Sequence, residues 1–278
     1  MKKISRRSFM AAAAVSVAAL ALTACGGSAS SAASSVASSA ASSEAASSAA
    51  TAELTTVEAG KLTMATNAAF PPYEMTTDAG EFEGIDVDTA KAIAEKLGLE
   101  LQIDDMDFDA ALLSVQQGKA DIVMAGVTVT DERKAGVDFS DSYATGIQSI
   151  IVPEGSDIAS PDDLAGKKIG TQRGTTGYIY CSDDFGDENV VAYDDGLTAV
   201  QALNNGQVDA VVIDNAPAQE FVAANPGLKV LDTSYAEEDY AIGMAKGSAL
   251  EDAVNKALEE LKADGTLQAI VDKYINAN

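Results

Sequence analysis

The stretch AGVTVTDERK, residues 125–134, sets one arginine, Arg133, behind a run of small and hydroxyl-bearing residues. Basic residues are scarce in this chain, with 18 Lys plus Arg against 43 Asp plus Glu. A guanidinium donates two parallel hydrogen bonds to a carboxylate, and a neighbouring hydroxyl such as that of Thr128 can add a donor. We therefore predict an anion-binding group at Arg133. The spacing leaves open that Arg133 only caps a short helix or pairs with Glu132.

A second charged group follows the apolar run AVVI and ends the motif AVVID, residues 210–214. The carboxylate of Asp214 suits an ammonium group, whereas the guanidinium of Arg133 suits a carboxylate. An α-amino acid carries both groups on one carbon, and buried charges are costly unless they are matched. The two residues together therefore predict a site for a zwitterion. Asp214 could instead be the N-cap of the helix that follows.

Two similar passages predict the elements that position these residues. LLSVQQGKADIVMAG (112–126) and AVQALNNGQVDAVVID (199–214) each have apolar residues at helical spacing, a glycine, and an aspartate that opens a short apolar run. Each indicates a helix ended by glycine and a buried strand. GKLTMATNAAF and GKKIGTQRGTT, which start at Gly60 and Gly166, each indicate a strand followed by a polar loop. An αβ unit that occurs twice predicts two α/β lobes.

The remaining periodicities fit this alternation. Helical spacing covers 84–98, 248–265 and 266–275, and residues 99–104 alternate like a strand. We expect parallel-rich sheets flanked by helices, with ligands beyond the carboxyl ends of the strands. That rule selects as candidate ligand-binding residues Asn67, Phe70, Gly126, Thr128, Thr130, Arg133, Gln172, Arg173, Thr175, Thr176 and Asp214, with Phe108 as a second aromatic. Phe70 and Phe108 could equally be core residues.

Composition narrows the chemistry further. The chain has no histidine, the commonest general base and metal ligand, and no nucleotide-binding glycine motif, so we expect no cofactor and no metal. The formal net charge of −25 disfavours binding to nucleic acid.

The N-terminal residues indicate an export signal rather than part of a folded domain. Residues 1–24 have a basic start and a short apolar run, and they end before Cys25 in a pattern that resembles a lipoprotein cleavage site. An ordinary secretory signal is the alternative, and SRRSF also resembles a twin-arginine export signal. Residues 25–56 then form a Ser/Ala-rich tract that predicts a flexible tether.

Six motifs in order resemble the bacterial family-3 extracellular solute-binding proteins, the amino-acid receptors of ABC importers. The motifs are FPPYE (70–74), GIDVD (84–88), AGVTVTDER (125–133), VDFSDSY (137–143), RGTTG (173–177) and AVVID (210–214). The resemblance runs from about residue 57 to the end. It implies a two-lobed periplasmic-binding-protein-like fold of type II, with lobe 1 at 57–143 and 243–278, and with two hinge strands and lobe 2 within 144–242.

The resemblance also implies roles. Arg133, Thr128 and Thr175 would bind the α-carboxylate, Asp214 and Gly126 the α-ammonium, and Phe70 and Phe108 would sandwich the ligand. A monomer anchored by the lipid on Cys25 to the outer face of the cytoplasmic membrane would deliver the amino acid to a permease and an ATPase.

The resemblance leaves the ligand and the partner open. Asn67 stands where many relatives that bind cationic side chains carry aspartate, and Gln172 where a glutamine-binding relative can carry lysine. We expect an uncharged polar side chain such as that of glutamine, with cystine and basic amino acids as alternatives. A sensor for a membrane signalling partner and a cyclohexadienyl-dehydratase-like enzyme are the alternative functions.

Overall fold

The computed structural model describes residues 54–275, which lie within one compact unit, residues 50–278. The expected signal peptide, Cys25 and all of the expected tether before Leu54 fall outside the described residues. Within residues 54–275, no helix is both long and apolar enough to cross a membrane.

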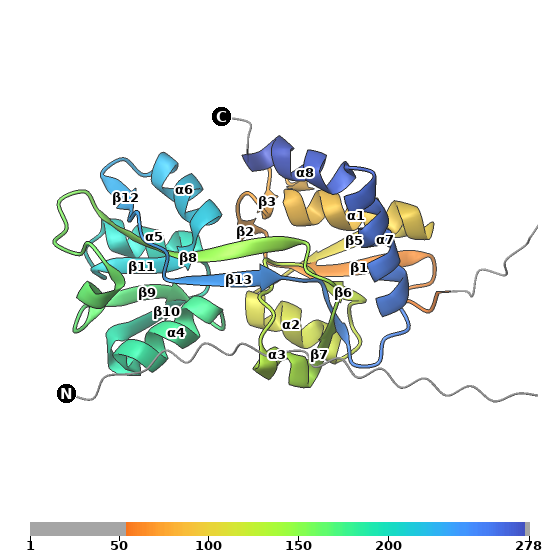
Figure 1. The fold of residues 1–278 in the computed structure, drawn as a ribbon, viewed down its shortest axis with the longest axis horizontal. Helices are drawn as coiled ribbons and strands as arrows, with labels where there is room; N and C mark the ends of the chain where they lie inside the picture. The colour runs from red at the N-terminus through yellow and green to blue at the C-terminus, as the bar shows by residue number, and fades with distance from the viewer. Residues whose placement is uncertain (1–53, 276–278) are drawn as a thin grey trace, which may run out of the picture. The chain divides into compact units, whose positions relative to one another are not determined.

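The first lobe is built on a five-stranded sheet of order β5-β1-β6-β14-β7 (Figure 1). Its strands are β1 (Lys61–Thr66), β5 (Glu100–Asp105), β6 (Ile122–Val123), β7 (Val137–Phe139) and β14 (Gly243–Ala245). Strand β1 pairs in parallel with β5 and β6, whereas β14 is antiparallel to both β6 and β7. The carboxyl ends of β1 and β6 therefore lie at the same edge of the sheet, which is where the expected site residues begin.

The second lobe is built on a six-stranded sheet. Its strands are β8 (Ala144–Pro153), β9 (Ile169–Gln172), β10 (Val190–Tyr193), β11 (Ala210–Asp214), β12 (Leu228–Val230) and β13 (Ala236–Tyr240). Strand β9 pairs in parallel with β10 and β11, and β8 is antiparallel to β11, β12 and β13. A small antiparallel sheet in the first lobe joins β2 (Ala69–Phe70), β3 (Glu74–Thr76) and β4 (Phe82–Glu83).

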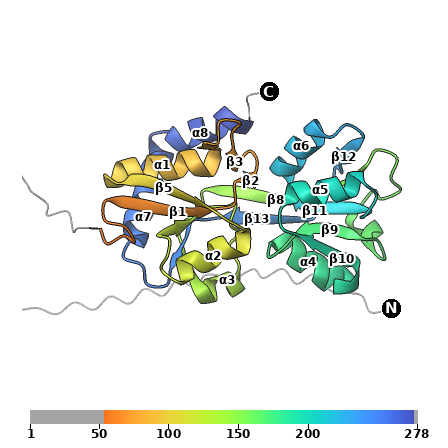
Figure 2. The same cartoon turned by 180° about the vertical axis from the view of Figure 1, so that it is seen from behind.

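Helices cover both faces of each main sheet, which confirms the expected fold class. In the first lobe, α1 (Ile85–Leu97) lies on one face with α7 (Glu251–Ala263) and α8 (Thr266–Ile275), and α2 (Phe108–Gln116) and α3 (Asp131–Gly136) lie on the other side (Figures 1 and 2). In the second lobe, α5 (Gly196–Asn204) and α6 (Asn215–Ala224) lie opposite α4 (Thr176–Phe185) (Figure 2).

In both lobes, the repeated αβ unit ends its helix with a glycine and begins its strand with an aspartate that accepts backbone hydrogen bonds. Gly118 and Gly206 follow the helices with φ of 65° and 67°, a left-handed conformation that glycine adopts at little cost. The Asp121 carboxylate accepts hydrogen bonds from the backbone N–H of Val57 and Thr63, and that of Asp209 from Lys168. Each aspartate therefore fixes the start of the neighbouring strand by binding N–H groups outside the ladder.

Strands β8 and β13 join the two lobes side by side (Figure 1). Their register places Tyr240 opposite Ala144 and Glu238 opposite Gly146. Tyr143 N–H also donates to the Tyr240 carbonyl, at 2.9 Å. This antiparallel pair lies where the family resemblance implied hinge strands, and it brings Glu238 and Tyr240 beneath the cleft between the lobes.

Candidate ligand-binding site

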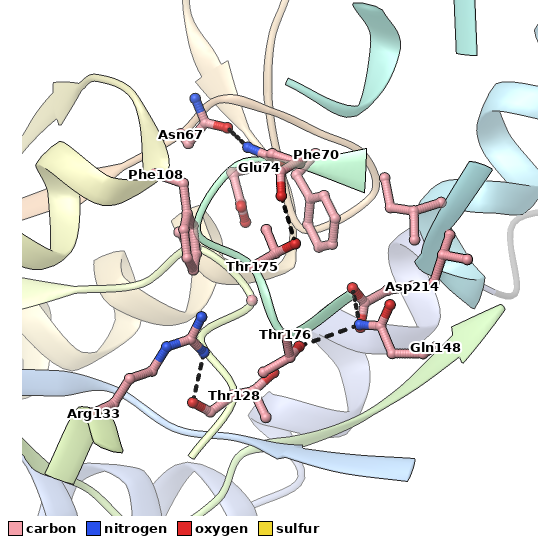
Figure 3. A pocket seen from close by; sticks show the side chains of 15 residues that line it. Asn67, Phe70, Glu74, Phe108, Thr128, Arg133, Gln148, Thr175, Thr176 and Asp214 are labelled. Carbon is pink, nitrogen blue, oxygen red and sulfur yellow. Dashed lines mark hydrogen bonds between the residues drawn. The ribbon is translucent and has the colours of Figure 1, made fainter. Parts of the chain in front are cut away.

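Ten of the twelve candidate ligand-binding residues line one pocket between the lobes (Figure 3). The pocket has about 420 Å³ of non-atom space, a volume that includes its open mouth. Its lining residues are Asn67, Phe70, Glu74, Phe108, Ala125, Gly126, Thr128, Arg133, Gln148, Gln172, Thr175, Thr176, Val212, Ile213 and Asp214. The other two candidates, Thr130 and Arg173, are absent from this lining. Thr130 is instead the N-cap of α3, and Arg173 borders a neighbouring surface hollow.

The Arg133 side chain lies across the cleft rather than along its own helix. Thr130 is the N-cap of α3, and its hydroxyl accepts from the backbone N–H of Arg133. The guanidinium donates to the backbone carbonyls of Thr128 at 2.8 Å and of Gly174 in the other lobe at 3.1 Å. It also lies 5.1 Å from the centre of the Phe108 ring, a cation–π distance. These contacts orient the fork and leave other N–H groups for an anion.

Burial lowers the pKa of Arg133, although the negative charges of Glu238 and Asp214 act to raise it. A guanidinium stays charged even when its pKa is somewhat lowered. It therefore supplies a partly desolvated positive charge, whose interaction with an anion is stronger than it would be in water.

The threonine hydroxyls of the pocket are already engaged. Thr128 and Thr176 donate to Oε2 of Glu238 at 3.1 Å and 3.0 Å. The Thr175 hydroxyl donates to the Gln172 carbonyl and accepts from the N–H of Tyr178, as the N-cap of α4. In this arrangement the three oxygens can accept from a ligand, whereas donation to a ligand carboxylate would require the hydroxyls to rotate.

Asp214 ends β11 and precedes α6, but its side chain makes no N-cap hydrogen bond. Its carboxylate instead accepts from Gln148 Nε2 at 2.9 Å and from the Tyr240 hydroxyl. Only 8% of Asp214 is exposed, and burial raises its pKa to about 7; the charge of Glu238 acts in the same direction, whereas the hydrogen bonds from Tyr240 and Gln148 oppose it. An arriving ammonium would favour the charged carboxylate.

Glu238 on β13 connects several polar residues at the base of the pocket by hydrogen bonds. Besides the two threonines, its Oε2 accepts from Gln148 Nε2 at 3.0 Å. Gln148 therefore bridges Asp214 and Glu238 with one amide nitrogen. This network fixes groups from both lobes relative to the joining strands.

Two aromatic rings form the apolar wall of the pocket. Phe70 and Phe108 are 7% and 6% exposed, and each also belongs to the core of the first lobe, so the core and ligand interpretations are compatible. Gly126 adopts a φ of 55°, and a Cβ there would lie 2.8 Å from the Phe70 ring. Its N–H donates to Asp86 rather than into the pocket.

Asn67 of the first lobe and Gln172 of the second are joined by a hydrogen bond across the cleft. Gln172 Nε2 donates to Asn67 Oδ1 at 2.8 Å, and Asn67 Nδ2 donates to the Met106 carbonyl at 3.0 Å. The Asn67 amide is thus occupied by protein partners on both its oxygen and its nitrogen.

Sequence reasoning missed Glu74 and Gln148 as lining residues, and Glu238 and Tyr240 as their supports. Gln148 carried a detectable signal, a polar residue inside the apolar run GIQSIIV, residues 146–152. Glu238 alternates with exposed acids on β13, so only strand pairing distinguishes it from them. Among residues 54–275, no cluster of three His, Cys, Asp or Glu side chains could hold a metal ion.

Comparison with known proteins places these residues in a family. The model for bacterial extracellular solute-binding proteins, family 3, matches residues 62–277. The chain belongs to this family. A probable histidine-binding protein of Neisseria gonorrhoeae is 34% identical, over 95% of this chain and 94% of its own length.

Two solved structures are also similar to this family member. An ancestral arginine-binding protein bound to glutamine has a TM-score of 0.75 and 44% identity, and the match covers 78% of this chain and 98% of that one. An ancestral arginine-binding protein bound to arginine has a TM-score of 0.74, with the same identity and coverage.

Proposed function

We propose that this chain captures one α-amino acid between its two lobes and delivers it to an ABC importer. The observation that carries this proposal is the placement of Arg133 and Asp214 on opposite lobes beside one pocket. The ligand carboxylate would bind the free N–H groups of Arg133, and the ligand ammonium would bind Asp214. The amino-acid ligands in the names of the relatives support this class of ligand.

The ligand side chain would then extend towards the aromatic wall, beside Glu74 (Figure 3). An uncharged polar side chain such as that of glutamine fits the pocket, because Asn67 adds no charge. A cationic side chain is the second candidate, favoured by the carboxyl group of Glu74 at the same wall. Phe70 and Phe108 would pack against the aliphatic part of either side chain.

The proposed division of the chain is lobe 1 at 57–143 and 243–278, with the hinge strands and lobe 2 at 144–242. The two crossings of the chain between the sheets, at β8 and β13, support it. Ligand binding would stabilise contact between the lobes because only then do both charged groups reach one zwitterion. The partner would be a permease with its ATPase, and a membrane signalling protein is the alternative that the same shape could serve.

The proposed role is binding without catalysis. The relatives are binding proteins, and the charged groups of the pocket are arranged to match a zwitterion. We further propose that the chain is a monomer anchored outside the cytoplasmic membrane through a lipid on Cys25. That residue lies outside the described residues, and metabolic labelling with a fatty acid, with Cys25→Ser as control, would test the anchor.

A thermal-shift panel of the twenty amino acids and cystine tests the function. The sequence has no tryptophan, so unfolding is best followed with a dye or by circular dichroism. A ligand at one hundred times its Kd adds about 2.7 kcal/mol to the free energy of unfolding. We expect shifts with glutamine, with arginine, or with both. A well-folded protein whose unfolding temperature no amino acid changes would contradict the proposal.

A further inference from the structure

Glu74 is a buried acid at the wall of the ligand pocket. It lies on β3, its side chain is 0% exposed, and neither carboxyl oxygen has a hydrogen-bond donor among the described residues. Figure 3 shows it between Phe70 and Phe108, on the side of the pocket away from Arg133. An ionised carboxylate in such a place would be strongly penalised by desolvation.

Asp86, in the first turn of α1, is the immediate partner of Glu74. It is also 0% exposed. Its Oδ2 accepts from Gly126 N–H at 3.0 Å and from the Tyr143 hydroxyl at 2.8 Å, whereas its Oδ1 lacks a donor. The backbone brings the two residues together, because Asp86 N–H donates to the carbonyl of Tyr73, the residue before Glu74, at 2.8 Å. Hydrogen bonding between the two side chains acts to raise the pKa of Glu74 and to lower that of Asp86. One proton between them would satisfy Asp86 Oδ1 and neutralise one of two adjacent buried charges.

The surroundings determine which acid holds that proton. Asp86 receives two donors that stabilise its charged form, and Glu74 receives none, so Glu74 is the protonated member. Burial raises the pKa of Glu74 well above its usual value, and the charge of Asp86 adds to this. Four other titratable groups interact with the pair, and all are acids: Tyr73, Tyr143, Asp105 and Asp214.

We propose that the Glu74–Asp86 pair matches the charge of the ligand side chain by keeping or releasing one proton. This rests on the proposed function, because Arg133 and Asp214 must first hold the backbone of the amino acid. With an uncharged amide in the pocket, Glu74 stays protonated towards Asp86 and its second oxygen accepts an N–H from the ligand. With a guanidinium or ammonium in the pocket, Glu74 releases its proton to solvent and pairs as a carboxylate.

Because Glu74 can keep or release its proton, the pocket has two protonation states, and the charge of each suits one class of ligand side chain. A neutral ligand side chain meets a pair of net charge −1, whose charged member, Asp86, is stabilised by the hydrogen bonds from Gly126 N–H and the Tyr143 hydroxyl. A cationic side chain meets a pair of net charge −2, so the added positive charge is neutralised where it is buried. The same residues can therefore bind two side-chain classes without rearrangement of the backbone.

Calorimetry of arginine and glutamine binding to the full folded domain tests this inference. Titrations at pH 6, 7 and 8, in buffers with different ionisation enthalpies, count the protons released. We expect arginine to release up to one proton more than glutamine, and the ratio of their affinities to change in favour of arginine by up to about tenfold per pH unit. Any proton released by Asp214 is common to both ligands and cancels in the comparison. Equal proton release and a ratio independent of pH would overturn the proposal.

Two substitutions separate the roles within the pair. Glu74→Gln can still donate to Asp86 but cannot ionise, so its selectivity for arginine over glutamine at pH 8 should fall by at least about tenfold and lose its pH dependence. Asp86→Asn can donate to Glu74 and removes the adjacent charge, so arginine should bind without the extra proton release. The matched control Glu83→Gln, on neighbouring β4 and outside the pocket lining, should behave like the natural protein.

The outcomes distinguish this inference from the proposed function. Binding of glutamine to the natural protein establishes the amino-acid site whatever the proton count shows. Binding of arginine with wild-type selectivity by Glu74→Gln would refute the role of the pair while leaving that site intact. If Glu74→Gln does not fold, the proton count of the natural protein and of Asp86→Asn still decides the matter.

Discussion

The Arg133 guanidinium donates from Nη2 to the backbone carbonyl of Gly174 at 3.1 Å, so a side chain of the first lobe holds the backbone of the second. The Asp109 side chain also lies against Gly174, where it occupies the space that a Cβ would need. One cation therefore connects the lobes and faces the pocket, which links ligand binding to the contact between the lobes.

Arg133→Ala should weaken amino-acid binding by about 2–5 kcal/mol, because it removes one member of a desolvated charge pair and one link between the lobes. Calorimetry measures the loss. The matched control is Arg173→Ala, which removes an exposed guanidinium 3.6 Å from Asp194, outside the pocket lining. Equal affinities of the Arg133 variant and the control would remove Arg133 from the site.

Amino-acid affinity should fall as the pH drops below about 7, because the buried Asp214 carboxyl has a pKa of about 7 and an ammonium requires its charged form. The slope should approach tenfold per pH unit, about 1.4 kcal/mol. Glutamine is the suitable ligand, since its side chain does not titrate. Asp214→Asn should bind weakly at pH 8 and lose this slope; an unchanged slope in that variant would assign the titration to another group.

The unliganded protein should become less stable as the pH rises from 5 to 8. Burial raises the pKa of Glu74, of Asp86 to about 6 and of Asp214 to about 7, so the folded state binds more protons than the unfolded state in this range. Each such group contributes stability that is present below its unfolded pKa and lost as the pH rises through its folded pKa. Thermal unfolding at several pH values measures this trend, and Asp214→Asn should flatten it near pH 7. A melting temperature that increases with pH would contradict this reading.

The hydrogen bond between Gln172 and Asn67 should contribute equally to the affinity for every ligand. Since both Asn67 amide groups bind protein atoms, replacement of either residue by leucine should shift the lobes apart rather than change specificity. The expected loss is about 0.5–1.5 kcal/mol for glutamine and for arginine alike. A double-mutant cycle gives the coupling between the two residues. A loss confined to one amino acid would instead indicate that Asn67 contacts the ligand.

Gly146→Ala should weaken ligand binding without touching the pocket. A Cβ at Gly146 would lie 2.5 Å from the ring of Tyr240, whose hydroxyl donates to Asp214. The buried ring would have to move, at a cost of about 1–3 kcal/mol. Gly155→Ala is the matched control, because a Cβ there meets nothing within 4 Å and neither glycine has a positive φ. If the two variants bind the ligand with comparable affinities, the position of the Tyr240 ring does not influence ligand binding.

The local pattern of apolar residues and glycines was sufficient to predict much of the fold. The helices at 85–97, 251–263 and 266–275 follow from apolar spacing, and Gly118 and Gly206 mark the change from helix to strand in both repeated units. Parallel strands collect their carboxyl ends at one edge, so Arg133 and Asp214 could be assigned to a common site before any contact was known.

Only the tertiary structure determined which buried groups surround the charged residues of the site. Glu74, Asp86 and Glu238 are three acids among many in an acidic chain, and nothing in their neighbours along the sequence indicates burial. Their roles depend on strand register and on packing between segments far apart in the chain, which bring Thr128 to Glu238 and Glu74 to Asp86. The sequence determined which charged groups the protein has; long-range packing set their desolvation, and desolvation sets where they titrate and what they can bind.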